Sequence, residues 1–170
     1  MLIYLDANIV QYCADHRKFV FGESDTCETA DRKLKEELNA LRRLVDLEQL
    51  GDWTFAAPAH LLSELLAGNP RPEQIDTYKL LKEAWNDSVW SEDARPTEDT
   101  IHRIERSLVA LQLRHASDQR HLAEALALNA SWFLTNDRDV VKKGKLGVGT
   151  MRVCRPSECL ADISTGLFLK

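Results

Sequence analysis

Two acidic residues follow short apolar runs near the two ends of the chain. Asp6 comes directly after residues 2–5, and Asp137 follows residues 132–135 with Asn136 between them. Runs of this length and composition predict buried strands. Because open parallel sheets bind ligands at the carboxyl ends of their strands, both carboxylates are expected at one edge of a sheet. The pattern therefore predicts an acidic, metal-binding cleft.

Two further acids are predicted to reach the same edge. Glu64 lies on a helix predicted for residues 59–67, and Asp118 stands in the first turn of a helix that leads into the strand at 131–135. A helix of about 12 residues spans roughly 18 Å, and the strand returns along it, so Asp118 and Asp137 can meet. Four carboxylates at close range repel one another, and a hard divalent cation with oxygen ligands removes that cost. The bound ion would lower the pKa of a water and stabilise a charged phosphate.

Each acid also has a structural interpretation. The order of strand and acid at Asp6 suits a helix N-cap, and Asp118 beside Ser117 suits a favourable charge at a helix N-terminus. Glu64 fits a solvated position on its helix as well as it fits a ligand. Asp139 is interpreted as an additional ligand or as a surface acid.

Apolar spacing and turn residues place the acids on alternating strands and helices. Strands are predicted at 2–5, 53–57, 131–135 and 151–154. Helices are predicted from 7, over 28–49, 59–67, 72–85 and 98–114, from the cap Ser117, and from 156, with a loop over 15–27. This alternation favours an α/β sandwich built on a mainly parallel sheet.

Four motifs of the chain resemble those of the PIN-domain ribonucleases. They are Leu-Asp-Ala-Asn at 5–8, Leu-Leu-Ser-Glu-Leu-Leu at 61–66, Asp118 opening an Ala-rich helix, and Leu-Thr-Asn-Asp at 134–137. The resemblance covers most of the chain. It implies one PIN-like domain over 1–170, an α/β/α sandwich with a helical insertion at about 69–116.

The same resemblance implies an activity and a set of site residues. The protein is expected to be an Mg²⁺- or Mn²⁺-dependent endoribonuclease that cuts RNA and leaves a 5′-phosphate. Many compact relatives are toxins of bacterial toxin–antitoxin pairs, so an antitoxin partner and a homodimer are expectations as well. The implied catalytic and metal-binding acids are Asp6, Glu64, Asp118 and Asp137, supported by Asn8, Thr135, Asn136 and Asp139.

A short basic stretch follows Asp137. Arg138, Lys142 and Lys143 are candidates for holding substrate phosphates, with a solvated surface as the alternative. Trp85 and Trp90 are predicted to pack in the core, although bases could stack on them. The histidines at 60, 102, 115 and 121 are predicted to be structural or exposed, with His121 a remote candidate one turn after Asp118.

Composition narrows the classes of function. The net charge of −5 argues against a module that holds nucleic acid by its own cations, but not against an enzyme that uses metal ions. No apolar run approaches the roughly 20 residues of a membrane helix, and no export signal begins the chain, so a cytoplasmic protein without membrane contact is expected. The cysteines at 13, 27, 154 and 159 are then expected as free thiols.

Two other functions stay open on the sequence. Asp6 could be the nucleophile of a phosphohydrolase, although such enzymes use a second acid two positions on, where this chain has Asn8. Alternatively, the chain is a non-catalytic PIN-like module that binds RNA or protein.

Overall fold

Four parallel strands form the centre of the molecule. The computed structural model describes residues 1–48, 53–83, 96–145 and 148–165. The strands are β1 (Leu2–Leu5), β2 (Thr54–Ala56), β3 (Trp132–Leu134) and β4 (Arg152–Cys154), and their order in the sheet is β2-β1-β3-β4. All three pairings are parallel, as the alternation of strands and helices predicted.

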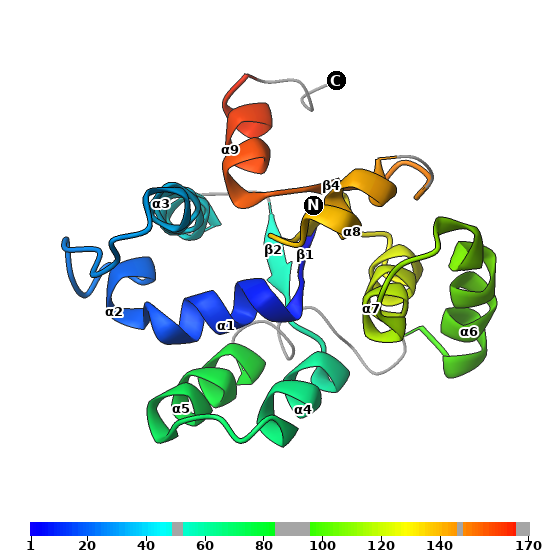
Figure 1. Cartoon of the computed structure of the whole chain (residues 1–170), viewed down its shortest axis with the longest axis horizontal. Coiled ribbons are helices and arrows are strands. Elements are labelled where there is room, and N and C mark those ends of the chain that lie inside the picture. Colours follow the sequence, from blue (N-terminus) through cyan, green and yellow to red (C-terminus); the bar gives the residue numbers. More distant parts are fainter. Residues whose placement is uncertain (49–52, 84–95, 146–147, 166–170) are drawn as a thin grey trace.

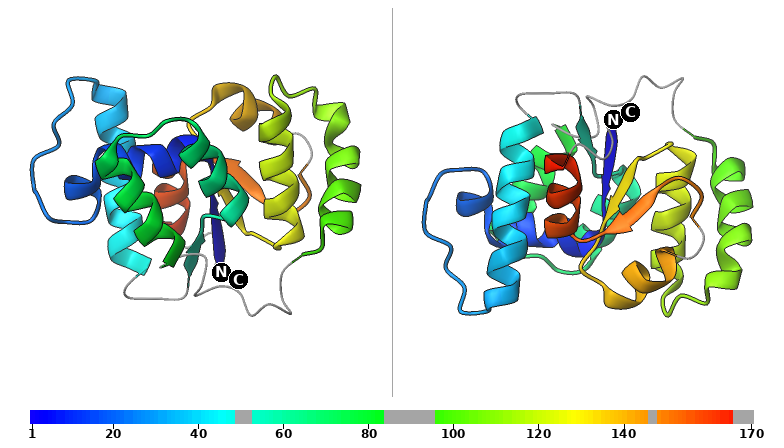
Figure 2. Two further views of the ribbon diagram at one scale, coloured as in Figure 1. Left: turned by 90° about the horizontal axis from the view of Figure 1, so that it is seen from below. Right: turned by 90° about the horizontal axis from the view of Figure 1, so that it is seen from above.

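Helices lie on both sides of this sheet. In Figure 1, α3 and α9 lie above the sheet, α4 and α5 below it, and α6 and α7 to its right, and the two views of Figure 2 agree. This layout is compatible with the predicted α/β/α sandwich. The helices are α1 (Ala7–Asp15), α2 (Arg17–Val20), α3 (Arg32–Glu48), α4 (Ala59–Ala67), α5 (Pro72–Leu81), α6 (Glu98–Ser107), the 3-10 helix η3 (Leu108–Leu111), α7 (Ala116–Ala127), α8 (Arg138–Gly144) and α9 (Pro156–Ser164).

The two central strands carry the core. Tyr4 on β1 and Phe133 on β3 are both fully buried, and their rings stack with centroids 5.2 Å apart. Trp132, Ile3 and Phe55 are buried beside them. Strands covered on both faces read as continuous apolar runs, which is why β1 and β3 could be predicted from composition alone.

The register of these strands brings distant residues together. Leu5 pairs with Leu134 at the carboxyl ends of β1 and β3. The next backbone amide, that of Asp6, donates to the carbonyl of Leu134 at 3.0 Å. Asp6 and Thr135, the next residues of the two strands, therefore lie side by side at this edge of the sheet.

Three local predictions were wrong. Residues 15–27, predicted as a loop, contain the short helix α2. The helix predicted for 98–114 is interrupted at Ser107, continues as η3, and ends where Gln112 takes a left-handed conformation (φ 51°). The N-cap of α7 is the extended residue His115 and not Ser117, so that Ser117 lies inside the helix.

The remaining predictions concern the cysteines, membrane helices and two tryptophans. The four cysteines are free thiols, as expected. Among the described residues, no helix has both the length and the apolarity that a bilayer span requires. Trp85 and Trp90, and part of the helical segment predicted at about 69–116, lie outside the described residues.

Candidate active site

Asp6 is a buried carboxylate with a full set of donors. Its side chain is 3% exposed, and it caps α1, where Oδ1 accepts from the amide of Ala7 at 2.8 Å. Oδ1 also lies 3.2 Å from Nδ1 of His121, and Oδ2 accepts from Asn8 Nδ2 at 2.5 Å and Thr135 Oγ1 at 2.6 Å. The capping interpretation is thus correct for Asp6, and the same carboxylate also joins α1 to α7 and to the segment that follows β3.

Asn8 and Thr135 tie the ends of β1 and β3 to each other. Asn8 donates to Thr135 Oγ1 at 3.0 Å and accepts from the amide of Asn136 at 3.0 Å. Thr135 Oγ1 in turn accepts from the amide of Asp137 at 3.0 Å. This network fixes the loop that carries Asp137 relative to Asp6, so the predicted supporting residues Asn8, Thr135 and Asn136 do lie beside the acids.

Asp137 caps α8 through one oxygen. Its Oδ1 accepts from the amides of Asp139 at 2.7 Å and Val140 at 3.1 Å. Within the described part of the chain, both hydrogen bonds to this carboxylate go to Oδ1, which leaves Oδ2 for a cation.

Asp118 is the acid whose charge is least compensated. It lies in the first turn of α7, and among the described residues nothing donates a hydrogen bond to its side chain. Partial burial and the charges of Asp6 and Asp137 raise the pKa of Asp118 above its ordinary value. Asp6 and Asp137 therefore both lie within electrostatic range of Asp118.

Glu64 reaches this group through a histidine. α4 and α7 lie side by side (Figure 1, Figure 2), and the ring of His121, 2% exposed, lies between Asp6 and Glu64. His121 Nε2 is 2.9 Å from Glu64 Oε2, and His60 Nε2 is 3.5 Å from Glu64 Oε1. His60, Glu64 and His121 thus form a triad that could hold a metal ion.

The position of His121 between two carboxylates shifts the pKa of its ring. Burial alone would lower the pKa of His121, but the hydrogen bond to Asp6 and the charges of Asp6 and Glu64 outweigh that effect and raise the pKa. In the absence of a metal ion, the two carboxylates therefore favour the protonated ring more than water would.

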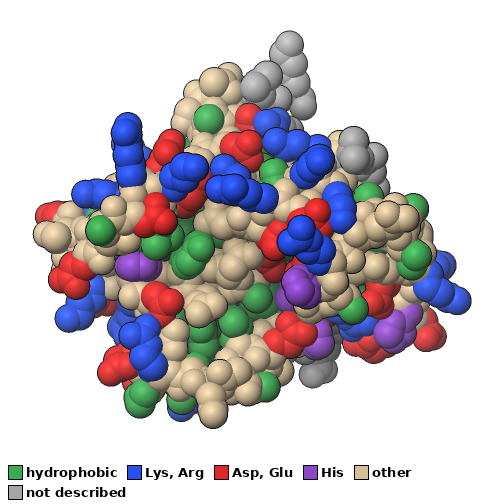
Figure 3. All heavy atoms as spheres, viewed as in Figure 1, with side chains coloured by type: hydrophobic (Ala, Val, Ile, Leu, Met, Phe, Trp, Pro, Cys, Tyr) green, Lys and Arg blue, Asp and Glu red, His purple; other side chains and the backbone are tan. Residues whose placement is uncertain are grey.

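Basic side chains surround an open cavity of about 500 Å³ next to Asp137. Arg138 and Lys142, two of the candidates for holding substrate phosphates, line it. Lys143 lies differently, because its amine pairs with Asp139 at 2.9 Å and donates to the carbonyl of Gln112. Figure 3 shows acidic, basic and histidine side chains close together over α7 and α8. The lining is completed by Arg114, Asn136 and Asp139.

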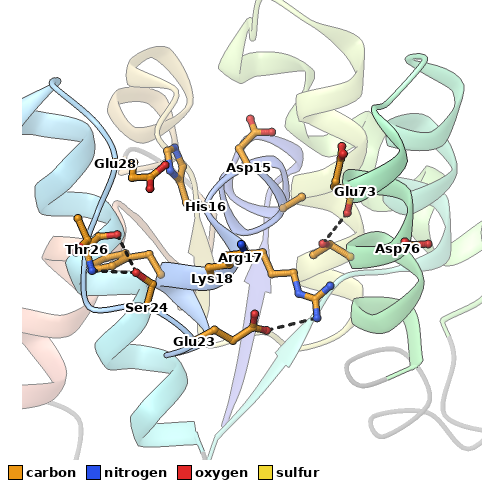
Figure 4. A pocket seen from close by; sticks show the side chains of 13 residues that line it. Asp15, His16, Arg17, Lys18, Glu23, Ser24, Thr26, Glu28, Glu73 and Asp76 are labelled. Atoms are coloured by element: carbon orange, nitrogen blue, oxygen red, sulfur yellow. Dashed lines mark hydrogen bonds and ion pairs between the residues drawn. The ribbon is translucent and has the colours of Figure 1, made fainter.

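A second cavity, also of about 500 Å³, lies at the other end of α1. Since α1 has nine residues, its ends are roughly 13 Å apart. Figure 4 shows mixed charges around this cavity, with Arg17 paired to Glu23 at 3.4 Å. None of the acids predicted for the site lines it.

Comparison with family models, with curated proteins and with solved structures finds no match to this chain. Three aspartates that repel one another, with cations at their edge, suit a divalent cation and a phosphate group.

Three residues that matter to this geometry are absent from the predicted set of site residues. His121 was only a remote candidate, and His60 was predicted to be structural or exposed; it is exposed, and its Nε2 faces Glu64. The spacing of four residues between His60 and Glu64 was the available signal, because it places both on one helix face. Arg114 follows η3 and has no local pattern that would have indicated its place in the cavity.

Proposed function

We propose that this protein is a metal-dependent endoribonuclease of PIN-like architecture that hydrolyses phosphodiester bonds of RNA. The observation that carries the proposal is Asp118, which receives no hydrogen bond among the described residues and whose pKa is raised by burial and by the charges of Asp6 and Asp137. A protein that needed these acids only as helix caps would have no reason to gather them where they raise the pKa of one of them.

The donor set fits Mg²⁺ or Mn²⁺, because hard divalent ions take oxygen ligands. Asp118 and the Oδ2 atom of Asp137 are the carboxylate groups that would hold such an ion, with Glu64 as the fourth acid of the expected set. When bound, the ion would supply a water of lowered pKa and a counter-charge for the phosphate.

The remaining residues have roles that need no ion. Arg114 and Lys142 line the cavity beside Asp137, and their positive charges would bind the phosphates that flank the cut. Asn8 and Thr135 hold the Asp6 carboxylate and the loop of Asp137 in one arrangement, which keeps the acids in place before substrate arrives.

Cleavage of RNA by the purified protein tests the proposal. Wild type with Mg²⁺ or Mn²⁺ is expected to cleave, and chelation is expected to stop it. Asp137→Asn should lose cleavage while keeping the helix cap, because Asn caps a helix about as well as Asp. The control is Asp46→Asn, an exposed acid on α3, which should cleave like wild type. Cleavage that survives chelation or Asp137→Asn contradicts the proposal.

A second candidate function is a non-catalytic module that binds RNA. The observation in its favour is Asp6, whose two oxygens already receive four contacts from protein donors. A carboxylate so occupied also suits a purely structural role, and it is poorly placed to be the nucleophile of a phosphohydrolase. Tight RNA binding without cleavage in Mg²⁺ and in Mn²⁺ would favour this second candidate.

The toxin role and its partners are a separate part of the proposal. A toxin would be blocked by a small antitoxin, whose gene is expected next to that of this protein. Expression of the chain alone should then arrest growth, and Asp137→Asn should relieve the arrest. A homodimer is the expected oligomeric state, which light scattering would measure.

A further inference from the structure

We infer that His60, Glu64 and His121 form a separate site for a nitrogen-preferring transition ion such as Zn²⁺. The ligand atoms of these three residues all lie within 4.8 Å of one another. The site shares Glu64 with the acids discussed above, but it rests on its own geometry and not on the proposed nuclease activity.

Asp6 orients the ring of His121 so that it can bind a metal ion. Its Nδ1 lies 3.2 Å from Asp6 Oδ1, which fixes the ring plane and directs Nε2 toward Glu64. Ligating histidines in metal sites almost always pass their second ring nitrogen to a carboxylate or carbonyl in this way. Asp6 is therefore the residue that orients the ligand.

The other nitrogen of His121 faces a carboxylate. Nε2 is buried, and Glu64 Oε2 lies 2.9 Å from it, although within the described residues the geometry is not that of a hydrogen bond. In the neutral ring that donates through Nδ1, Nε2 carries a lone pair that faces the lone pairs of this oxygen. A metal cation between the two atoms would offset their repulsion, as a proton does in the charged ring. A small widening of the 2.9 Å spacing, to roughly 3.3 Å, lets both atoms bind one tetrahedral ion at about 2.1 Å.

His60 brings a second imidazole to the same carboxylate. Its Nε2 lies 3.5 Å from Glu64 Oε1, one helical turn away, so that ring nitrogens flank both oxygens of Glu64 and a metal ion could use both rings. The two rings have centroids 6.1 Å apart at an interplanar angle of 65°. Tetrahedral ligands of one Zn²⁺ lie roughly 3.3 Å apart. The side chain of His60 is exposed, so it can rotate to bring its ring nitrogen within that distance of the other two ligand atoms.

The ligand types select the metal. Imidazole nitrogen suits Zn²⁺, Ni²⁺, Co²⁺ and Cu²⁺, whereas Mg²⁺ prefers oxygen and keeps its waters. Two histidines and one carboxylate leave a fourth position of a tetrahedral ion open to water or to a phosphate oxygen. The site is thus of the open kind, and its ion would stand beside the three aspartates through Asp6 and Glu64.

Titration of the metal-free protein with Zn²⁺ tests the inference, with binding followed by calorimetry in excess Mg²⁺ and without RNA. Wild type is expected to bind one Zn²⁺ that Mg²⁺ does not displace. His60→Ala should weaken binding by at least about 100-fold, since it removes a direct ligand. His60 is exposed, so this variant is expected to fold. The matched control is His102→Ala, an exposed histidine on α6, which should bind Zn²⁺ like wild type.

Co²⁺ supplies a second measurement. Tetrahedral Co²⁺ with two imidazole ligands absorbs strongly in the visible range, and this absorption should appear in wild type and His102→Ala and vanish in His60→Ala. Equal Zn²⁺ affinity of wild type and His60→Ala, or no binding to wild type, overturns the inference. Failure of RNA cleavage would contradict the nuclease proposal and leave these titrations unchanged, so the two ideas fail separately.

Discussion

Two carboxylates of the molecule, Glu37 and Asp118, show opposite ways of placing an acid. Glu37 on α3 is 8% exposed and accepts from both the amide and the hydroxyl of Ser157, each at 2.9 Å. It thereby joins α3 to the N-terminus of α9. Asp118 receives no hydrogen bond among the described residues and faces two further acids. Glu37 thus has donors for both of its oxygens and serves the fold, whereas Asp118, which has none among the described residues, is the acid that we propose for a metal ion.

The largest effect is expected from Asp118→Asn, which removes the uncompensated charge. If Asp118 holds the metal ion, cleavage should fall by at least about 100-fold. The free energy of unfolding should stay the same or rise, because a repulsion has been removed. Cleavage rates and urea unfolding measure the two quantities. Unchanged cleavage together with a less stable protein would mean that Asp118, like Glu37, serves the fold and not the ion.

Glu37→Gln should give the opposite result. The Gln side chain can accept from the Ser157 amide and donate to its hydroxyl, but both hydrogen bonds lose their charge assistance, so the free energy of unfolding should fall by about 1 kcal/mol. RNA cleavage by the folded protein should not change. Glu36→Gln, an exposed neighbour on the same helix, is the control and should unfold like wild type in urea. A loss of cleavage without a loss of stability in Glu37→Gln would contradict the structural role.

The pH dependence of stability tests whether His121 offsets the charge of the acids around it. The folded-state pKa of this ring is raised above the unfolded value of about 6.5. Its contribution to stability is therefore complete below pH 6.5 and is lost as the pH rises through the folded-state pKa. Thermal unfolding with chelator from pH 6 to pH 9 should reveal this decline, and His121→Asn should lack it. A wild-type decline that the variant retains in full would assign the effect to another group.

The smallest effect is expected at the basic edge of the cavity. Arg114→Gln and Lys142→Gln should weaken RNA binding severalfold, because each removes one phosphate contact. The salt dependence should fall as well, by about 0.7 in the slope of log K against log[salt] per contact with single strands. Lys35→Gln, exposed on α3, is the control and should change neither quantity. Equal slopes for all three variants would remove Arg114 and Lys142 from the RNA-binding surface.

The parts of the site that were predicted from sequence are those fixed by strand ends. Asp6 and Asp137 follow apolar runs, and parallel pairing of two such runs brings their ends together whatever the loops do. Asp118 was predicted because its helix returns into β3. His121 was not, since its role depends on the angle between α4 and α7 and on the Asp6 rotamer. No local pattern encodes either quantity.

The hydrogen bond from Thr135 to Asp6 spans 129 positions of the chain. A ribosome must therefore have released most of the 170 residues before the acids can be brought together. Contacts of such long range form late in folding, because loop closure must come first. A nascent or truncated chain cannot assemble the cleft, so any cutting activity would arise only after translation is nearly complete.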